Sequence, residues 1–371
     1  MADTTRHTHG SSPKGLAKRR SPLPLRGVPP RILAILALAV CVISVVSACF
    51  FGPMDIPARD VLRLLTAHCT GAESSLAKEL GPAASVVVWD IRMSRTLLAL
   101  LTGGALAVAG AVFQGILRNP LADPFTLGVS SGAAFGASLA IMLGFTGTLI
   151  PGVGSLPAAA LGGALLALTA VILLGRSGGR LRRETLVLAG VVVATFLAAL
   201  ISLVKSLDEE SVASIVFWIM GSLQGRGWQE VALMFPWLTV GGLLIWRYSR
   251  ELDILALGDT QARQLGMNAD RVRLWLLVGA SMLTGAAVAV SGVIGFVGLV
   301  VPHLVRMAQG GEHRPLLVTA ALCGGVLLLW SDVAARTLLP GGAELPVGVV
   351  TALLGGPFFC LLLRHRARTD S

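Results

Sequence analysis

About ten apolar runs, separated by short polar gaps, dominate this chain. A helix needs about 20 apolar residues to cross the hydrocarbon core of a bilayer. The runs lie near residues 32–51, 96–117, 127–145, 156–175, 185–205, 230–246, 273–291, 299–308, 316–336 and 346–363. The run at 299–308 is short, and Gly292, Gly295 and Gly298 just before it predict a broken or turned start. We therefore expect an all-α polytopic membrane protein with about ten transmembrane helices.

Composition excludes a soluble class. Charged residues make up 13% of the 371 residues, whereas soluble domains carry about a quarter. The net charge of +10 alone would suit a nucleic-acid partner, but the basic residues fall in the gaps between apolar runs, so we expect membrane lipid and no nucleic acid. Four cysteines lie in apolar runs and Cys69 is expected in a loop, a pattern without zinc-type spacing or a disulfide framework.

The distribution of Lys and Arg predicts the orientation. With ten spans and a cytoplasmic N-terminus, 22 of the 30 basic residues lie on the cytoplasmic side, as the positive-inside rule requires. Residues 1–31 then form a disordered basic cytoplasmic tail, residues 32–365 a single membrane domain, and residues 366–371 a second cytoplasmic tail. The first apolar run is long and lacks an obvious cleavage site, which favours an anchor over a cleaved signal peptide.

An internal echo suggests a repeat. Residues 101–120 match residues 283–302 at nine of 20 positions, although the bias toward Ala, Gly and Leu inflates such matches. In the predicted topology the first copy runs inward and the second outward. This is an inverted internal repeat, a recurring plan among transporters.

Four stretches carry a family resemblance: "WDIRMSRTLLALLTGGALAVAGAVFQGILRNPLADPFTLGVSSGA" (89–133), "LALGDTQARQLG" (255–266), "SGVIGFVGLVVPHLVR" (291–306) and "ELPVGVVTALLGGPFF" (344–359). In this order they resemble the iron-siderophore and cobalamin permease family of binding-protein-dependent ABC importers, over roughly residues 30–365. One departure is Ser94, where the family usually has Pro between two arginines.

The segment "RNPLADP" interrupts two apolar runs. Pro120 and Pro124 disfavour helix at the residues before them, so the chain turns compactly there. By pattern alone this is a polar loop between helices. The resemblance implies a cytoplasmic gate, with Asn119, Pro120 and Leu121 beside Arg182, Arg183 and Glu184.

The longest cytoplasmic gap, 247–272, contains "LALGDTQARQLG". It is too polar to span the membrane and predicts a short helix that ends near Gly266, with a positive φ there. By pattern alone it is a solvated amphipathic loop. The resemblance implies the helix that couples the permease to its ATPase, through Leu257, Gly258, Ala262, Leu265 and Gly266.

Small residues follow the gate segment. Gly128, Ser130, Ser131 and Gly132 favour either close helix packing or a smooth pore wall, and the resemblance adds a wide channel for a large substrate.

Three arginines fall on the predicted outer face. The resemblance implies that Arg92, Arg95 and Arg336 dock a binding protein. The alternatives are snorkelling to headgroups, or pairing of Arg336 with Asp332 four residues before it.

No catalytic motif accompanies these features. The chain lacks "GxxxxGK[ST]", so it carries no P-loop ATPase of its own, and His303 is isolated in sequence, with no metal-site spacing. The sequence thus predicts a non-enzymatic permease without cofactor or metal, in the plasma or inner membrane of a bacterium. The resemblance implies two ATPase subunits, an extracytoplasmic substrate-binding protein and a second permease subunit. It favours a ferric siderophore as cargo, with cobalamin or haem as the alternative. A passive channel and an intramembrane hydrolase are the rival classes.

Overall fold

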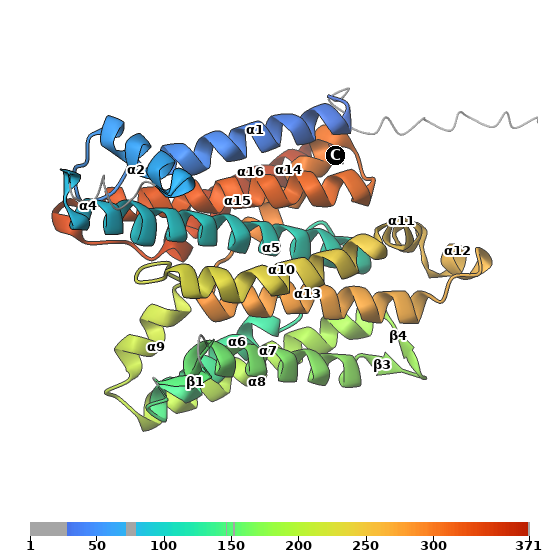
Figure 1. The fold of residues 1–371 in the computed structure, drawn as a ribbon. Helices are drawn as coiled ribbons and strands as arrows, with labels where there is room; N and C mark the ends of the chain where they lie inside the picture. Colours follow the sequence, from blue (N-terminus) through green and yellow to red (C-terminus); the bar gives the residue numbers. More distant parts are fainter. Residues whose placement is uncertain (1–27, 72–78, 146, 151–152, 370–371) are drawn as a thin grey trace, which may run out of the picture.

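The ten predicted spans correspond to ten helices in the computed structural model, which describes residues 28–71, 79–145, 147–150 and 153–369. The expected disordered tail lies largely outside the described residues. The helices lie roughly side by side in Figure 1. They are α1 (Pro30–Ala48), α5 (Ser94–Leu117), α6 (Val129–Met142), α7 (Ser155–Leu174), α8 (Arg183–Leu207), α10 (Trp228–Arg247), α13 (Ala269–Ser291), α14 (Val297–Gln309), α15 (His313–Thr337) and α16 (Val347–Thr369). The prediction of an all-α membrane fold is confirmed.

The ten helices differ in length and in how apolar they are. Seven described segments are long and apolar enough to cross a membrane, whereas α6 and residues 347–360 of α16 are shorter apolar helices. The α14 helix has only 13 residues. It starts after a non-helical stretch in which Gly292 (φ 69°) and Phe296 (φ 68°) both take left-handed conformations. The broken start predicted from the glycines is therefore confirmed.

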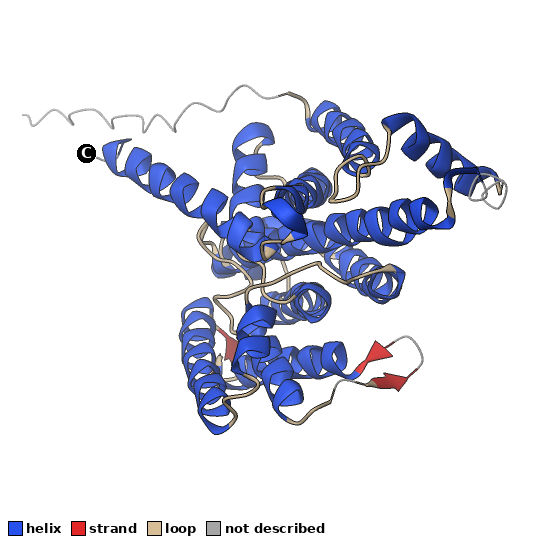
Figure 2. Ribbon diagram, turned by 90° about the vertical axis from the view of Figure 1, so that its left-hand side faces the viewer, coloured by secondary structure: helices blue, strands red, loops and turns tan. Residues whose placement is uncertain are grey.

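Several short elements were not predicted. They are the helices α2 (Ala58–Thr70), α4 (Pro82–Val86), α9 (Val212–Ile219) and α11 (Ser249–Leu257), the π-helix η1 (Val87–Met93) and the 3-10 turn η2 (Pro340–Gly342). The short helix predicted to end near Gly266 is α12 (Asp259–Gln264). Figure 2 also shows small antiparallel hairpins, β1–β2 (Thr148–Ile150, Val153–Gly154) and β3–β4 (Arg176–Ser177, Arg180–Leu181). One loop expectation is wrong, because Cys69 lies in α2. α16 continues to Thr369, into the predicted tail 366–371.

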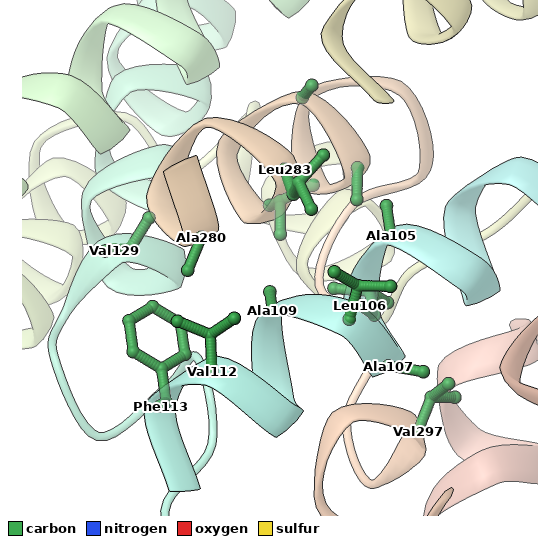
Figure 3. Close-up of a cluster of buried hydrophobic side chains, with 14 of the residues drawn as sticks. Ala105, Leu106, Ala107, Ala109, Val112, Phe113, Val129, Ala280, Leu283 and Val297 are labelled. Carbon is green, nitrogen blue, oxygen red and sulfur yellow. The ribbon is translucent and has the colours of Figure 1, made fainter. Parts of the chain in front are cut away.

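The core is built around α5, which is buried along most of its length. Figure 3 shows its side chains meeting Val129 of α6, Ala280 and Leu283 of α13 and Val297 of α14. A Cβ on Gly103 would collide with the Gly324 carbonyl of α15, and one on Gly110 with the Gly298 carbonyl of α14. Small residues thus let the backbone of α5 lie close to its neighbours. Such close packing stabilises helix contacts in lipid, where water supplies no hydrophobic driving force.

The two halves have the same order of helices. The first half runs α5, α6, α7, α8 and the second α13, α14, α15, α16, with a short second helix in each. Figure 1 shows α5 and α13 running in opposite directions, as an inverted repeat requires. The residue register differs from the sequence match, because position 110, in the middle of α5, aligns with Gly292, where α13 has ended. The start of α1 and the end of α16 lie at the same end as α11, α12 and β3–β4 (Figure 1).

Candidate coupling and gate site

The turn after α5 is fixed by its own backbone and side chains. Arg118 ends α5 in a left-handed conformation with φ 50°, unusual for a residue other than glycine. The side chain of Asn119 accepts a hydrogen bond from the Leu121 amide at 3.0 Å. Asp123 Oδ1 accepts from the amides of Phe125 and Thr126 at 3.0 and 3.1 Å. The compact turn predicted from the prolines is confirmed, and Asx contacts hold it together.

Burial changes the acidity of this turn. Burial raises the pKa of the Asp123 carboxyl to about 6, although the two amide hydrogen bonds favour its charged form. Asp123 is therefore only partly ionised near pH 6.

The predicted coupling segment consists of two helices. α11 ends at Leu257, Gly258 (φ 132°) turns the chain, and α12 begins at Asp259. Gly266 has φ 75°, so the predicted left-handed conformation is confirmed. Ala262 is fully buried, whereas Leu257 and Leu265 are 61% and 65% exposed. The segment thus holds one face against the protein and presents two leucines to the outside.

The turn at residues 118–126 (the gate turn, after its predicted role) and the α11–α12 segment lie next to each other. A Cβ placed on Gly258 would be 3.3 Å from Nη1 of Arg118. The turn also packs on α8, because a Cβ on Gly190 would collide with the backbone of Thr126. Arg182, Arg183 and Glu184 stand where β4 leads into α8, and Arg183 Nε donates to Glu184 Oε1 at 2.5 Å. The three predicted segments are therefore gathered at one end of the molecule.

Sequence comparison gives the family. Residues 38–365 match the model of the FecCD transport family. The chain belongs to the FecCD transport family. It is 43% identical over 283 residues to the cobalamin import system permease protein BtuC of Halobacterium salinarum, covering 76% of this chain and 74% of that one. It is 44% identical over 287 residues to the hemin transport system permease protein HmuU of Yersinia pestis, covering 75% and 84%.

A solved structure supports the same assignment. An ABC transporter assigned to the metal-chelate type, in an inward-facing conformation, matches with a TM-score of 0.77 and 31% identity. The match covers 91% of this chain and 99% of the other. The FecCD assignment confirms the family resemblance and makes this chain a multi-pass membrane permease of the ABC type.

The three arginines that the sequence placed on the outer face are buried in this FecCD permease. Arg92, Arg95 and Arg336 are 2%, 5% and 4% exposed. Arg95 binds Asp332 with Nη2 to Oδ1 at 2.7 Å and Glu344 with Nη1 to Oε2 at 2.8 Å. Arg336 lies 3.8 Å from Asp332 and donates to the carbonyl of Ala48 at 3.2 Å. Docking to a binding protein needs exposed arginine side chains, and in this chain all three are buried. The alternative in which Arg336 pairs with Asp332 is present.

Arg92 is held by backbone groups. Its guanidinium donates to the carbonyl of Cys49 at 3.0 Å and to that of Met54. Ser94, at the position where the family usually has Pro, is buried and donates to the carbonyl of Asp90 at 2.5 Å. The helical run continues through Ser94, so the departure from the family pattern does not loosen the chain.

The predicted pore residues lie mostly in a helix contact. Gly128, Ser130 and Gly132 are buried and Ser131 is half-buried. A Cβ on Gly132 would collide with the Gly163 carbonyl of α7, and this places the glycine in close packing between α6 and α7. Close helix packing, one of the two predicted roles, therefore accounts for Gly132. A pore-lining role for Ser131 stays a prediction.

One polar contact near the gate was not predicted. Asp253 Oδ1 of α11 accepts from the backbone amide of His313 at 3.0 Å and lies 2.6 Å from its Nδ1, at the start of α15. A Cβ on Gly115 would meet His313 Nε2 at 2.9 Å, so this histidine also touches α5 near the gate turn. In the described part of the chain no group of three or more His, Cys, Asp or Glu residues could hold a metal ion, and His303 is buried in α14.

Proposed function

We propose that this chain is the permease subunit of a binding-protein-dependent ABC importer that moves a metal chelate into the cytoplasm. FecCD membership supports the permease role. The observation that carries the ATP-driven mechanism is the exposed pair Leu257 and Leu265 on the α11–α12 segment, beside Arg118 of the gate turn. Exposed apolar side chains on a short, partly polar helical segment are typical of a site that docks another protein.

In the proposed assembly, two ATPase subunits bind the α11–α12 segments on the cytoplasmic side. A second permease subunit, identical or closely related, completes the translocation path, and an extracytoplasmic binding protein delivers the cargo. Closure of the ATPase pair pushes on α12, and the neighbouring turn at residues 119–121 and the start of α8 respond. ATP chemistry belongs to the partners, and the permease itself contributes movement. A bacterial plasma or inner membrane with both termini inside is the proposed location.

The cargo is proposed to be a ferric siderophore, as the sequence motifs favour. Cobalamin or haem is the second candidate, because the relatives in Halobacterium salinarum and Yersinia pestis are named for cobalamin and hemin transport. The binding protein encoded with this permease is proposed to supply most of the choice among them.

Uptake by cells tests the class and the cargo together. A strain that lacks this permease is supplied with labelled ferric siderophore, cobalamin or haem, and the gene is then restored. We expect restored uptake of one chelate, abolished by deletion of a separate ATPase gene. Uptake that persists without the ATPase would support a passive channel, and cleavage of a membrane substrate without transport would support a hydrolase.

A further inference from the structure

Arg273 is a buried charge at the junction of three cytoplasmic segments. It lies in the first turns of α13 and is 2% exposed. Nη2 donates to Asp259 Oδ1 at 2.6 Å, and Asp259 is the first residue of α12. Nη1 of the same guanidinium donates to the carbonyl of Leu181, the last residue of β4. One planar group therefore joins α12, α13 and the β3–β4 hairpin.

Asp270 fixes the other backbone group of Leu181. Its Oδ1 accepts from the Leu181 amide at 3.0 Å and lies 3.7 Å from Nη1 of Arg273. Both hydrogen-bonding groups of Leu181 are thus held by side chains of α13. Leu181 directly precedes Arg182 and Arg183, where α8 begins. The start of α8 is consequently fixed to α13, and through Arg273 to α12.

Arg273 does not need Asp259 to balance its positive charge. Asp270, in the same helix, already places a carboxylate near Arg273, and the side chain of Asp259 is 43% exposed. A guanidinium that donates from two nitrogens in a fixed plane transmits orientation better than a flexible ammonium group does. This geometry favours a role in moving α12 and the start of α8 together.

We propose that Arg273 is a positioning residue that makes α12 and the β4–α8 junction move as one body during the transport cycle. The inference rests on the proposed function, because it requires α12 to receive a push from an ATPase. Breaking the Arg273–Asp259 contact then lets α12 move without carrying α8. ATP hydrolysis continues, but less cargo crosses for each ATP consumed.

The first measurement is cargo imported per ATP hydrolysed by the complete transporter in proteoliposomes. In Arg273→Lys, which keeps the charge but not the two-nitrogen geometry, the ratio is expected to fall by roughly two- to thirtyfold, the range of coupling changes along such networks. Basal ATP hydrolysis and co-purification of the ATPase are expected to stay unchanged, because Arg273 is buried in α13 and lies outside the docking segment. Asp259→Ala removes the carboxylate that accepts from Arg273 and should give the same loss of coupling. Arg271→Ala, an exposed arginine two residues away, is the matched control and should match the wild type.

The second measurement is the distance between spin labels at the exposed positions Gln264 of α12 and Arg180 of β4, with and without ATP. In the wild-type complex this distance should stay constant, and in Arg273→Lys it should change or broaden. An unchanged ratio and an unchanged distance in both variants would overturn the proposal. Loss of ATPase binding in Asp259→Ala together with wild-type coupling in Arg273→Lys would also overturn it, by making Asp259 a partner contact. A wild-type complex without ATP-driven import would instead overturn the proposed function, and the label distances would still report on Arg273.

Discussion

Arg95 donates hydrogen bonds to both carboxylate oxygens of Asp332, at 2.7 to 3.0 Å, across 237 positions of sequence. The contact joins the start of α5 to the C-terminal part of α15. Glu344, in the loop before α16, binds the same guanidinium, and Arg336 lies near the same carboxylate. Two buried arginines therefore share the Asp332 carboxylate, and Arg95 has Glu344 as a second partner.

Asp332→Asn is expected to destabilise the permease by about 3 kcal/mol, because it leaves buried positive charge with one carboxylate fewer. The measurement is the midpoint of thermal unfolding in detergent. Glu79→Gln is the control, since Glu79 is exposed and pairs with the exposed Arg63 at 3.0 Å, so its loss should change little. Unchanged stability in Asp332→Asn would return Arg95 and Arg336 to the role of docking residues for a binding protein.

Docking by Arg92 and Arg95 remains a prediction with its own test. The double substitution Arg92→Glu with Arg95→Glu should weaken association with the binding protein, and high salt should weaken the wild-type complex, if charge steers the encounter. The burial of both side chains adds the expectation that less folded protein accumulates. Normal affinity of the folded double variant at low ionic strength would contradict docking through these residues.

Gly266→Val should impair uptake while the permease still accumulates in the membrane. At φ 75° a β-branched residue is strained, so the end of α12 must change shape. Uptake by cells and ATPase stimulation in vesicles measure the effect. Gly311→Ala is the control, because a Cβ there meets nothing within 4 Å and no positive φ is required. Wild-type uptake in Gly266→Val would exclude this segment as the coupling element.

Asp123 gives the gate turn a pH dependence. Its pKa of about 6 in the fold lies above the ordinary value of 3.8, so the folded protein binds the proton more tightly than the unfolded chain does. The Asp123 contribution therefore disfavours folding increasingly as pH rises from about 4 to 6, by an amount on the order of 1–3 kcal/mol. Asp123→Asn can keep both amide hydrogen bonds without the charge. It should be more stable than wild type at pH 7.5 and nearly equal at pH 4.5, and a pH-independent difference would contradict this.

Membrane topology offers a simple check. Ten spans and the distribution of Lys and Arg predict that both termini lie in the cytoplasm, and the structure places the start of α1 and the end of α16 at one end (Figure 1). A reporter fused after Arg364 should be active only if it functions in the cytoplasm. External activity would mean that this end of the bundle lies outside, and would reverse the sides predicted for α12 and for the arginines.

Much of the fold could be predicted because apolar periodicity is a local property. The ten spans, the broken start of α14 and the turn after α5 all follow from nearby residues. The β3–β4 hairpin also has a local signal, since Gly178 and Gly179 lie between its strands with positive φ, as a tight hairpin favours.

Long-range polar pairs could not be predicted from one sequence. A lone Arg273 or Asp253 in a polar gap is compatible with a solvated surface, and only the fold brings it to its partner. The same limit explains the outer face, where the family pattern marked Arg92, Arg95 and Arg336 but did not reveal that this chain buries them against its own carbonyls and carboxylates.

We propose that this FecCD permease converts ATP hydrolysis by a partner into import of a metal chelate. Uptake of labelled chelate into proteoliposomes that contain the permease, its ATPase and its binding protein, with ATP or a non-hydrolysable analogue, measures this conversion. We expect accumulation against a gradient with ATP, none with the analogue, and little with Gly266→Val. Equal entry of the chelate with and without hydrolysable ATP would exclude ATP-driven import.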